Sequence, residues 1–123
     1  MTLNTTPKSV TYTIDATDRT LGRVASEAAH ALLGKRSVHF AKNQALPMQV
    51  VVKNVGKLHL PVRRVKGKIY SRYTGYPGGQ RFENYAKLTA RRGHKEVLRR
   101  AVLGMLPKNK LQMRRIKMLT IED

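Results

Sequence analysis

The sequence predicts a small α/β domain, in which short strands alternate with helices along the chain. Three segments support this class: an alternating apolar and polar stretch at 12–15, a stretch of helical periodicity at 21–35, and a valine-rich stretch at 48–55. The chain has 123 residues, of which 41% are hydrophobic, and this suits one domain with one core. We therefore expect a short polar tail at 1–11 and a single domain at 12–123.

The first predicted strand is Tyr12–Asp15, and a helix follows it after a short loop. Asp18 or Thr20 is suited to cap this helix, because short polar side chains accept hydrogen bonds from unpaired backbone N–H groups. Gly34 is placed to end it, since glycine adopts the left-handed conformation common at helix ends. The apolar face of the helix consists of Leu21, Val24, Ala25, Ala28 and Leu32. We expect this face to pack closely against a sheet.

A second strand is predicted at Met48–Val55, where three valines follow one another. Continuous apolar character suits a strand that is covered on both faces, and therefore a parallel or mixed sheet. The segment Lys57–Tyr73 is expected to be extended or irregular, because Pro61 disfavours a helix there. Its last part, Lys68–Tyr73, is predicted to form a further strand.

Two helical pieces are predicted after the glycine-rich segment, one around Asn84–Arg92 and one at His94–Leu106. In the second piece, five residues share one face at helical spacing: Val97, Leu98, Ala101, Val102 and Met105. Pro107 ends this helix. A short helical turn is expected within Leu111–Lys117, and the alternating segment Met118–Glu122 is predicted to be the last strand.

The charge of the chain is strongly basic and unevenly distributed. There are 25 Lys and Arg residues against 7 acids, for a formal net charge of +18, and only Glu83 and Glu96 are acidic between Lys35 and Lys117. Solvated surfaces usually mix both signs. A polyanion supplies the missing counter-charge and gains entropy by releasing its condensed ions. Nucleic acid is favoured over an anionic membrane, because no basic amphipathic helix stands alone at a terminus.

Several other function classes are disfavoured by the sequence. There is no cysteine, which excludes disulfides and thiolate metal sites and fits a reducing compartment. No apolar run approaches the roughly 20 residues of a membrane helix, and the first residues lack the order of a secretory signal. The segment Thr74–Gly79, TGYPGG, matches neither a P-loop nor a dinucleotide-binding loop. The four histidines and seven acids form no catalytic or metal-ligating pattern, so we expect no enzyme activity, no cofactor and no metal.

The segment around TGYPGG is typical instead of an RNA-docking loop. Its glycines, Gly75, Gly78 and Gly79, allow positive φ and a close approach of the backbone to a partner. Aromatic rings that stack on unpaired bases are supplied by Tyr70, Tyr73 and Tyr76. Cations suited to phosphate are Lys66, Lys68, Arg72 and Arg81. The alternative is a surface turn whose tyrosines pack on the domain.

Two further basic elements extend this surface. After Pro107 the chain carries five cations in a short span: Lys108, Lys110, Arg114, Arg115 and Lys117. A third element, Gly34–Arg36, places Lys35 and Arg36 at the predicted end of the first helix. A run of charge is usually only solvated, but these runs continue a surface almost without acids. Contact with phosphate is therefore the better interpretation.

Four segments resemble a known family. DATDRTLGRVASEAAHALLGK, NVGKL, KIYSRYTGYPGG and AVLGMLPKNKL together are similar to the bacterial-type family of the large-subunit ribosomal protein numbered thirteen, from about Tyr12 to Ile121. The resemblance implies a three-layer α/β/α domain with a four-stranded, mainly parallel sheet. It also implies a structural constituent of the large ribosomal subunit that binds its rRNA and joins early in assembly, without catalysis or cofactor.

The resemblance places two segments and one helix-end residue on the rRNA side. These residues are Arg72, Thr74, Gly75, Tyr76, Pro77, Gly78, Gly79, then Pro107, Lys108, Asn109 and Lys110, and Lys35. The sequence departs from the family at several positions. Ser71 and Tyr73 stand where the family has Tyr and His, and Gln112-Met113 replaces Gly-Arg. Arg115 replaces an apolar residue, which suggests that the local helix turns toward RNA. The chain looks like a divergent member, from a fast-evolving lineage or an organelle.

Three function classes follow from these observations. The first is a ribosomal protein, with large-subunit rRNA and neighbouring large-subunit proteins as partners, located in the cytoplasm or in an organelle ribosome. This class has no membrane, no small-molecule substrate and no homo-oligomer. The second is a free-standing RNA- or DNA-binding regulator on the same scaffold. The third, an enzyme of nucleotide metabolism, lacks a phosphate loop and paired carboxylates. Copy number per large subunit separates the first class from the second.

Overall fold

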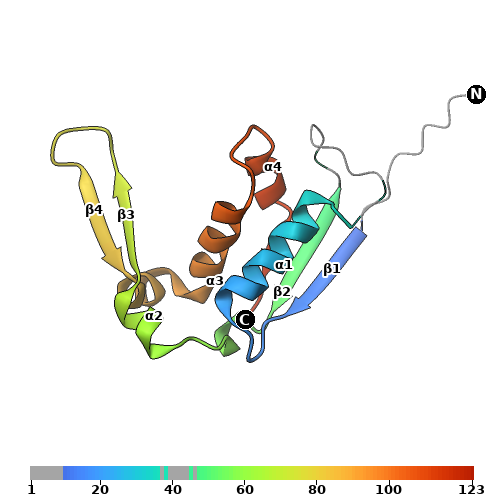
Figure 1. Ribbon diagram of the computed structural model, residues 1–123, viewed down its shortest axis with the longest axis horizontal. Helices are drawn as coiled ribbons and strands as arrows, with labels where there is room; N and C mark the ends of the chain where they lie inside the picture. Colours follow the sequence, from blue (N-terminus) through green and yellow to red (C-terminus); the bar gives the residue numbers. More distant parts are fainter. Residues whose placement is uncertain (1–9, 37, 39–44, 46) are drawn as a thin grey trace, which may run out of the picture.

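The computed structural model of the protein (Figure 1) describes residues 10–36, 38, 45 and 47–123. Within these residues, three strands form a parallel sheet in the order β1-β2-β5. They are β1 (Val10–Asp15), β2 (Met48–Lys53) and β5 (Leu119–Ile121). The α/β class is therefore confirmed. Most of the predicted tail lies outside the described residues, and β1 begins before it ends.

The sheet differs from the expected one in its number of strands and in its covering. The described residues contribute three parallel strands rather than four, and the two other strands pair with each other elsewhere. Burial alternates along β2, where Met48, Val50 and Val52 are buried and Gln49 and Lys53 are exposed. The prediction that both faces are covered is therefore wrong for these strands. Valine favours strands on either face, so a valine triplet does not specify two covered faces.

Helix α1 (Leu21–Leu33) covers the buried face of the sheet (Figure 1). All five residues of its predicted apolar face are buried. Thr20 occupies the N-cap position, although its side chain makes no capping hydrogen bond. Gly34 ends the helix with φ 80°, and its N–H donates to the Ala31 carbonyl at 3.1 Å. The boundaries predicted from the glycine and from the apolar spacing are confirmed.

The segment after β2 contains a helix that the sequence did not predict. A 3₁₀ turn, η1 (Val55–Lys57), is followed by α2 (Val62–Gly67), which begins directly after Pro61. Proline is excluded from helix interiors, but its fixed φ and missing N–H are compatible with the first positions of a helix. The expectation of an irregular segment was wrong, because the exclusion of proline from helix interiors does not apply to Pro61, which stands at the start of the helix.

A β-hairpin follows α2 and stands apart from the parallel sheet, on the far side of α3 in Figure 1. Its strands are β3 (Ile69–Tyr73), which was predicted, and β4 (Gln80–Asn84), which was not. They pair antiparallel, with Tyr70 opposite Glu83 and Arg72 opposite Arg81. The TGYPGG segment is therefore the tip of a hairpin.

Helix α3 (Tyr85–Met105) consists of the two predicted pieces, joined at a kink. Gly93 interrupts the helical backbone with φ 79° and ψ 178°. The Asn84 side chain caps the first piece by accepting from the Lys87 N–H at 2.8 Å. The second piece buries Val97, Leu98 and Val102, as predicted, but Met105 is exposed.

The core forms where α1 and α3 pack together over the sheet. The short helix α4 (Gln112–Ile116) follows α3 and leads into β5, so both predicted C-terminal elements are confirmed. The fold leaves the hairpin and the first half of α3 at one side of the core. These two elements face each other and form the site described next.

Candidate nucleic-acid interface

The tip of the hairpin is a tight turn built from the TGYPGG segment. The Gly79 N–H donates to the Tyr76 carbonyl at 3.0 Å, with Pro77 and Gly78 between them. Gly78 has φ 73°. Proline at the second position and a positive φ at the third define a type II turn. The Thr74 N–H donates to the Gly79 carbonyl at 3.3 Å and closes the loop.

The three glycines of the tip serve two different needs. Gly75 and Gly78 adopt positive φ, which agrees with the prediction made for them. Gly79 does not have positive φ; a Cβ there would collide with the Thr74 side chain and lie 2.9 Å from the Tyr76 carbonyl oxygen. The tip therefore presents a fixed backbone to its surroundings, with Tyr76 75% exposed.

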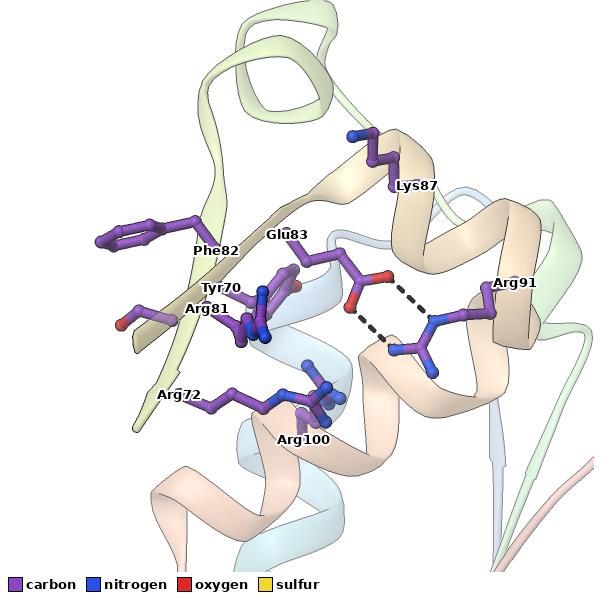
Figure 2. Close-up of a pocket in the computed structure, with 9 residues that line it drawn as sticks. Tyr70, Arg72, Arg81, Phe82, Glu83, Lys87, Arg91 and Arg100 are labelled. Atoms are coloured by element: carbon purple, nitrogen blue, oxygen red, sulfur yellow. Dashed lines mark hydrogen bonds and ion pairs between the residues drawn. The ribbon is translucent and has the colours of Figure 1, made fainter. Parts of the chain in front are cut away.

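An open groove of about 620 Å³ lies between the hairpin and α3 (Figure 2). It is lined by Tyr70, Ser71, Arg72, Arg81, Phe82, Glu83, Lys87, Arg91 and Arg100. Five of these side chains are basic and only one is acidic. A concave surface lined by charges of one sign focuses the electrostatic field and attracts anions. The groove is therefore the strongest candidate for an anion-binding site in the described part of the chain.

One wall of the groove is held by an ion pair between the hairpin and α3. The Arg91 guanidinium donates to both oxygens of the Glu83 carboxylate, from Nε at 3.0 Å and from Nη2 at 2.8 Å (Figure 2). Hydrogen bonding to Arg91 lowers the pKa of Glu83 below its ordinary value. A two-pronged contact of this kind fixes orientation as well as distance, so it sets the angle between β4 and the helix.

A second contact between the two elements involves Tyr70 on β3. The Arg100 guanidinium lies 5.4 Å from the centre of the Tyr70 ring, and the Lys68 ammonium lies at the same distance. Both distances are within the range of cation–π attraction. Burial raises the pKa of the Tyr70 hydroxyl. Arg100 also donates to Glu96 at 3.2 Å, so its charge is partly balanced within the protein.

The kink at Gly93 brings these contacts together. Arg91 lies in the first half of α3 and Arg100 in the second, yet both line the same groove. On a straight helix the two residues would lie along a single axis and would not both face the hairpin. The bend lets both halves of α3 face the hairpin.

Most of the predicted RNA-binding residues are exposed, and several share one end of the molecule. Thr74–Pro77 at the tip and Lys108–Lys110 before α4 are exposed. In Figure 1 the hairpin tip and the loop before α4 both lie along the upper edge. Arg114 and Lys117 of the α4 region are exposed too. The glycine-rich tip and the loop that carries Lys108 and Lys110, which are separated in sequence, therefore lie toward the same side of the molecule.

The remaining predicted cations are spread over other parts of the surface. Lys66 and Lys68 are exposed in and after α2, at the root of the hairpin rather than its tip. Lys35 and Arg36 are exposed after α1. Arg36 lies 3.7 Å from Glu27 and 5.4 Å from the centre of the Tyr12 ring. Its charge is thus partly engaged within the protein.

Arg115 does not fit the prediction that it contacts RNA. The residue is 1% exposed, and it lies in α4 next to the buried Ile116. Helical periodicity places consecutive residues on different faces, so the exposed Arg114 and the buried Arg115 face in different directions. The local helix turns this arginine inward, away from the surface of the protein.

Six residues that line the groove were not identified as binding residues from the sequence: Ser71, Phe82, Glu83, Lys87, Arg91 and Arg100. A usable signal existed for Phe82. A glycine-containing loop between two runs of strand-forming residues predicts a hairpin, and this would have paired Ser71 with Phe82. No sequence signal brings α3 onto the hairpin, because that contact depends on the kink and on long-range packing.

Neither a metal-binding cluster nor a membrane-spanning helix occurs in the part of the chain that the structure describes. No group of three or more His, Asp or Glu side chains in this part of the chain is placed to hold a metal ion. None of the helices there has the length and apolar character needed to cross a bilayer.

Fold and surface together define a small basic α/β protein whose interface suits a polyanion. Comparison with known sequences identifies the family. Residues 9–121 match the family model described as ribosomal protein L13. The chain is 40% identical to the large ribosomal subunit protein uL13 of Rubrobacter xylanophilus, 42% to that of Paraburkholderia phytofirmans and 43% to that of Treponema pallidum. These matches cover 89% of the chain and 76 or 77% of each relative. The chain belongs to the ribosomal protein L13 family.

Proposed function

We propose that the protein is a structural constituent of the large ribosomal subunit and binds its rRNA. Family membership supports the ribosomal role. The observation that carries RNA binding is the joint placement of the hairpin tip, the cationic groove and the loop before α4 on an acid-poor surface. In an isolated protein this charge repels itself, whereas rRNA neutralises it.

Each part of the surface has a defined task in this proposal. The glycine-rich tip, with Tyr73 and Tyr76, makes close contacts to sugars and unpaired bases. Exposed cations neutralise phosphates and set the orientation of the protein on the RNA. They are Lys35, Arg36, Lys66, Lys68, Arg72, Arg81, Lys108, Lys110, Arg114 and Lys117. Asn109 adds polar contacts beside the lysines.

The proposed setting is a bacterial-type ribosome, in the cytoplasm or in an organelle. One copy of the chain joins the subunit early in its assembly and contacts rRNA and neighbouring proteins, without forming a homo-oligomer. The protein acts by fixing the folded shape of rRNA. It requires no cofactor, metal or catalytic residue for this task.

Sedimentation of a lysate with quantitative mass spectrometry across the gradient tests the proposal. We expect close to one copy per large subunit, and this copy should remain after a high-salt wash. A protein found mainly at the top of the gradient would contradict the ribosomal role. It would indicate a free nucleic-acid-binding regulator on the same scaffold.

A further inference from the structure

We infer that the groove between the hairpin and α3 binds a phosphodiester of an RNA strand, with Arg72 and Arg81 as its ligands. Arg91 and Arg100 have a different role, which is to hold the walls of the groove. The inference deepens the proposed function and rests on it, because it names the site and the chemical group that this site takes.

Two like charges are paired across the hairpin. Arg72 lies directly opposite Arg81 in the strand register, on the face that also carries Tyr70 and Glu83. Like charges that lie opposite each other destabilise an antiparallel pair. A two-stranded sheet is marginally stable even without such a cost. An anion between the two guanidinium groups would turn this repulsion into attraction.

The cations of the groove differ in whether they already have acidic partners. Glu83 accepts both hydrogen bonds from Arg91, and Glu96 accepts from Arg100. Arg72, Arg81 and Lys87 form no ion pair with any described residue. The groove therefore divides its arginines into two sets. One set fixes the geometry through ion pairs. The other set forms no ion pair with the described residues and is available to a ligand, although the charge of Arg72 also helps to lower the pKa of Glu83.

The surroundings of the two arginines favour RNA as the source of the anion. Arginine forks match the oxygens of phosphate in a two-pronged manner, but carboxylates of an acidic peptide share this property. Phe82 decides between them. It is 66% exposed and extends from the hairpin away from the guanidinium groups (Figure 2). A phosphate held on one face and a base stacked on the other are both supplied by a nucleic-acid strand.

The experiment measures binding of the whole chain to an in vitro transcript of bacterial large-subunit rRNA over a range of salt concentrations. The double variant Arg72→Gln/Arg81→Gln is compared with Arg23→Gln/Lys53→Gln. The control pair removes the same charge from exposed residues of α1 and β2 that lie outside the groove. We expect the groove variant to lower the magnitude of the salt slope by about one unit, as for one lost phosphate contact. The control should keep the slope of the unchanged protein.

Two outcomes would overturn the inference. An unchanged slope in the groove variant would mean that these arginines touch no phosphate. An equal loss in both variants would mean that only total charge matters. Thermal unfolding of the free proteins controls for misfolding, and we expect no loss of stability in the groove variant because the opposed charges are removed.

A second probe separates RNA from an acidic protein partner, and a second readout separates this inference from the proposed function. If the groove variant loses as much affinity for polyglutamate as for rRNA, the ligand is an acidic peptide and the inference is wrong. One copy per subunit together with an unaffected groove variant would remove the groove site and leave the ribosomal role. A protein that sediments free of the subunit, but whose groove variant binds RNA more weakly than the control variant, would remove the ribosomal role and leave the groove site.

Discussion

Asp15, at the end of β1, organises the loop that leads into α1. One of its carboxylate oxygens accepts hydrogen bonds from the Thr17 hydroxyl at 2.7 Å, the Thr17 N–H at 3.0 Å and the Asn54 amide at 3.1 Å. These bonds, led by the Thr17 hydroxyl, lower the pKa of Asp15 to about 2. Because Asn54 follows β2, the carboxylate ties together the ends of two neighbouring parallel strands.

This network predicts a dependence of stability on acid. The ordinary pKa of the carboxyl is 3.8 and its folded pKa is about 2, so its contribution is fully present above pH 4. That contribution is lost as the pH falls toward 2, because protonation removes the charge that attracts the three donors. We expect Asp15→Asn to be less stable at pH 7 and to show a weaker fall in stability between pH 4 and pH 2.

Urea unfolding at several pH values measures this effect. Asp18→Asn is the matched control, because the Asp18 carboxylate makes no hydrogen bond or ion pair with the described residues. An acid profile of Asp15→Asn that coincides with the unchanged protein would contradict the role given to the network.

At the scale of elements, the kink in α3 determines whether the groove exists. Gly93 has φ 79° and ψ 178°, a conformation that is essentially restricted to glycine. It joins the half of α3 that carries Arg91 to the half that carries Arg100, and both residues line the groove. Two helical pieces could be predicted from the sequence, but the angle between them could not.

Gly93→Ala should therefore destabilise the protein by about 1–3 kcal/mol, because alanine is strained in this conformation. Gly104→Ala is the control in the same helix, since a Cβ there meets nothing within 4 Å. The control should be neutral or more stable by up to about 1 kcal/mol. Chemical denaturation measures both. Equal stability of the two variants would mean that the kink is not constrained.

The ion pair between Glu83 and Arg91 gives a second prediction at this scale. Glu83→Gln raises the net charge by one, so charge alone predicts tighter binding to RNA. We expect weaker binding instead, because the hairpin loses its fixed angle to α3. Faster hydrogen exchange of the hairpin amides should accompany this change.

Glu27→Gln provides the comparison for this variant. Glu27 also pairs with arginines, Arg19 and Arg36, but it lies outside the groove. The Glu27→Gln variant should leave the hydrogen exchange of the hairpin amides unchanged and should not weaken RNA binding. If both variants bind RNA more tightly, orientation of the hairpin does not matter.

For the whole molecule, the decisive property is a net charge of +18 over a chain of 123 residues. Only two acids lie between Lys35 and Lys117, so few of the cations in that range can be neutralised internally, even though Arg36 and Lys95 pair with acids outside it. The two acids within the range, Glu83 and Glu96, bond to arginines of α3. The free protein is consequently expected to gain most from a polyanion at low ionic strength.

The contribution of these cations to binding can be tested in the assembled particle with the loop before α4. Replacing Lys108 and Lys110 with Ala should release the protein from large subunits at a lower salt concentration than the unchanged chain. The salt slope of rRNA binding should also fall by about one unit for each phosphate contact that is lost. Salt washes of purified subunits, followed by quantitative mass spectrometry, measure the release. Retention equal to that of the Arg23→Gln/Lys53→Gln variant would show that these lysines contact no phosphate.

The sequence by itself determined the fold class, the positions of α1, β1, β2, β3 and β5, the break in α3 and the basic character of the surface. These features depend on local periodicity, on glycine and proline chemistry, and on charge counts, all of which are readable along the chain. The tip and the lysines before α4 could be predicted as candidate RNA contacts for the same reason. The family resemblance was confirmed over nearly the same span.

The tertiary structure decided which residues and elements lie next to one another. Burial of Arg115, the covering of one sheet face and the placement of α3 beside the hairpin all depend on contacts between segments distant in sequence. The pairing of Arg91 with Glu83, and the lack of an ion pair between Arg72 or Arg81 and any described residue, follow from the same packing. Composition shows that cations are in excess, but only distances between side chains show which of them already have partners.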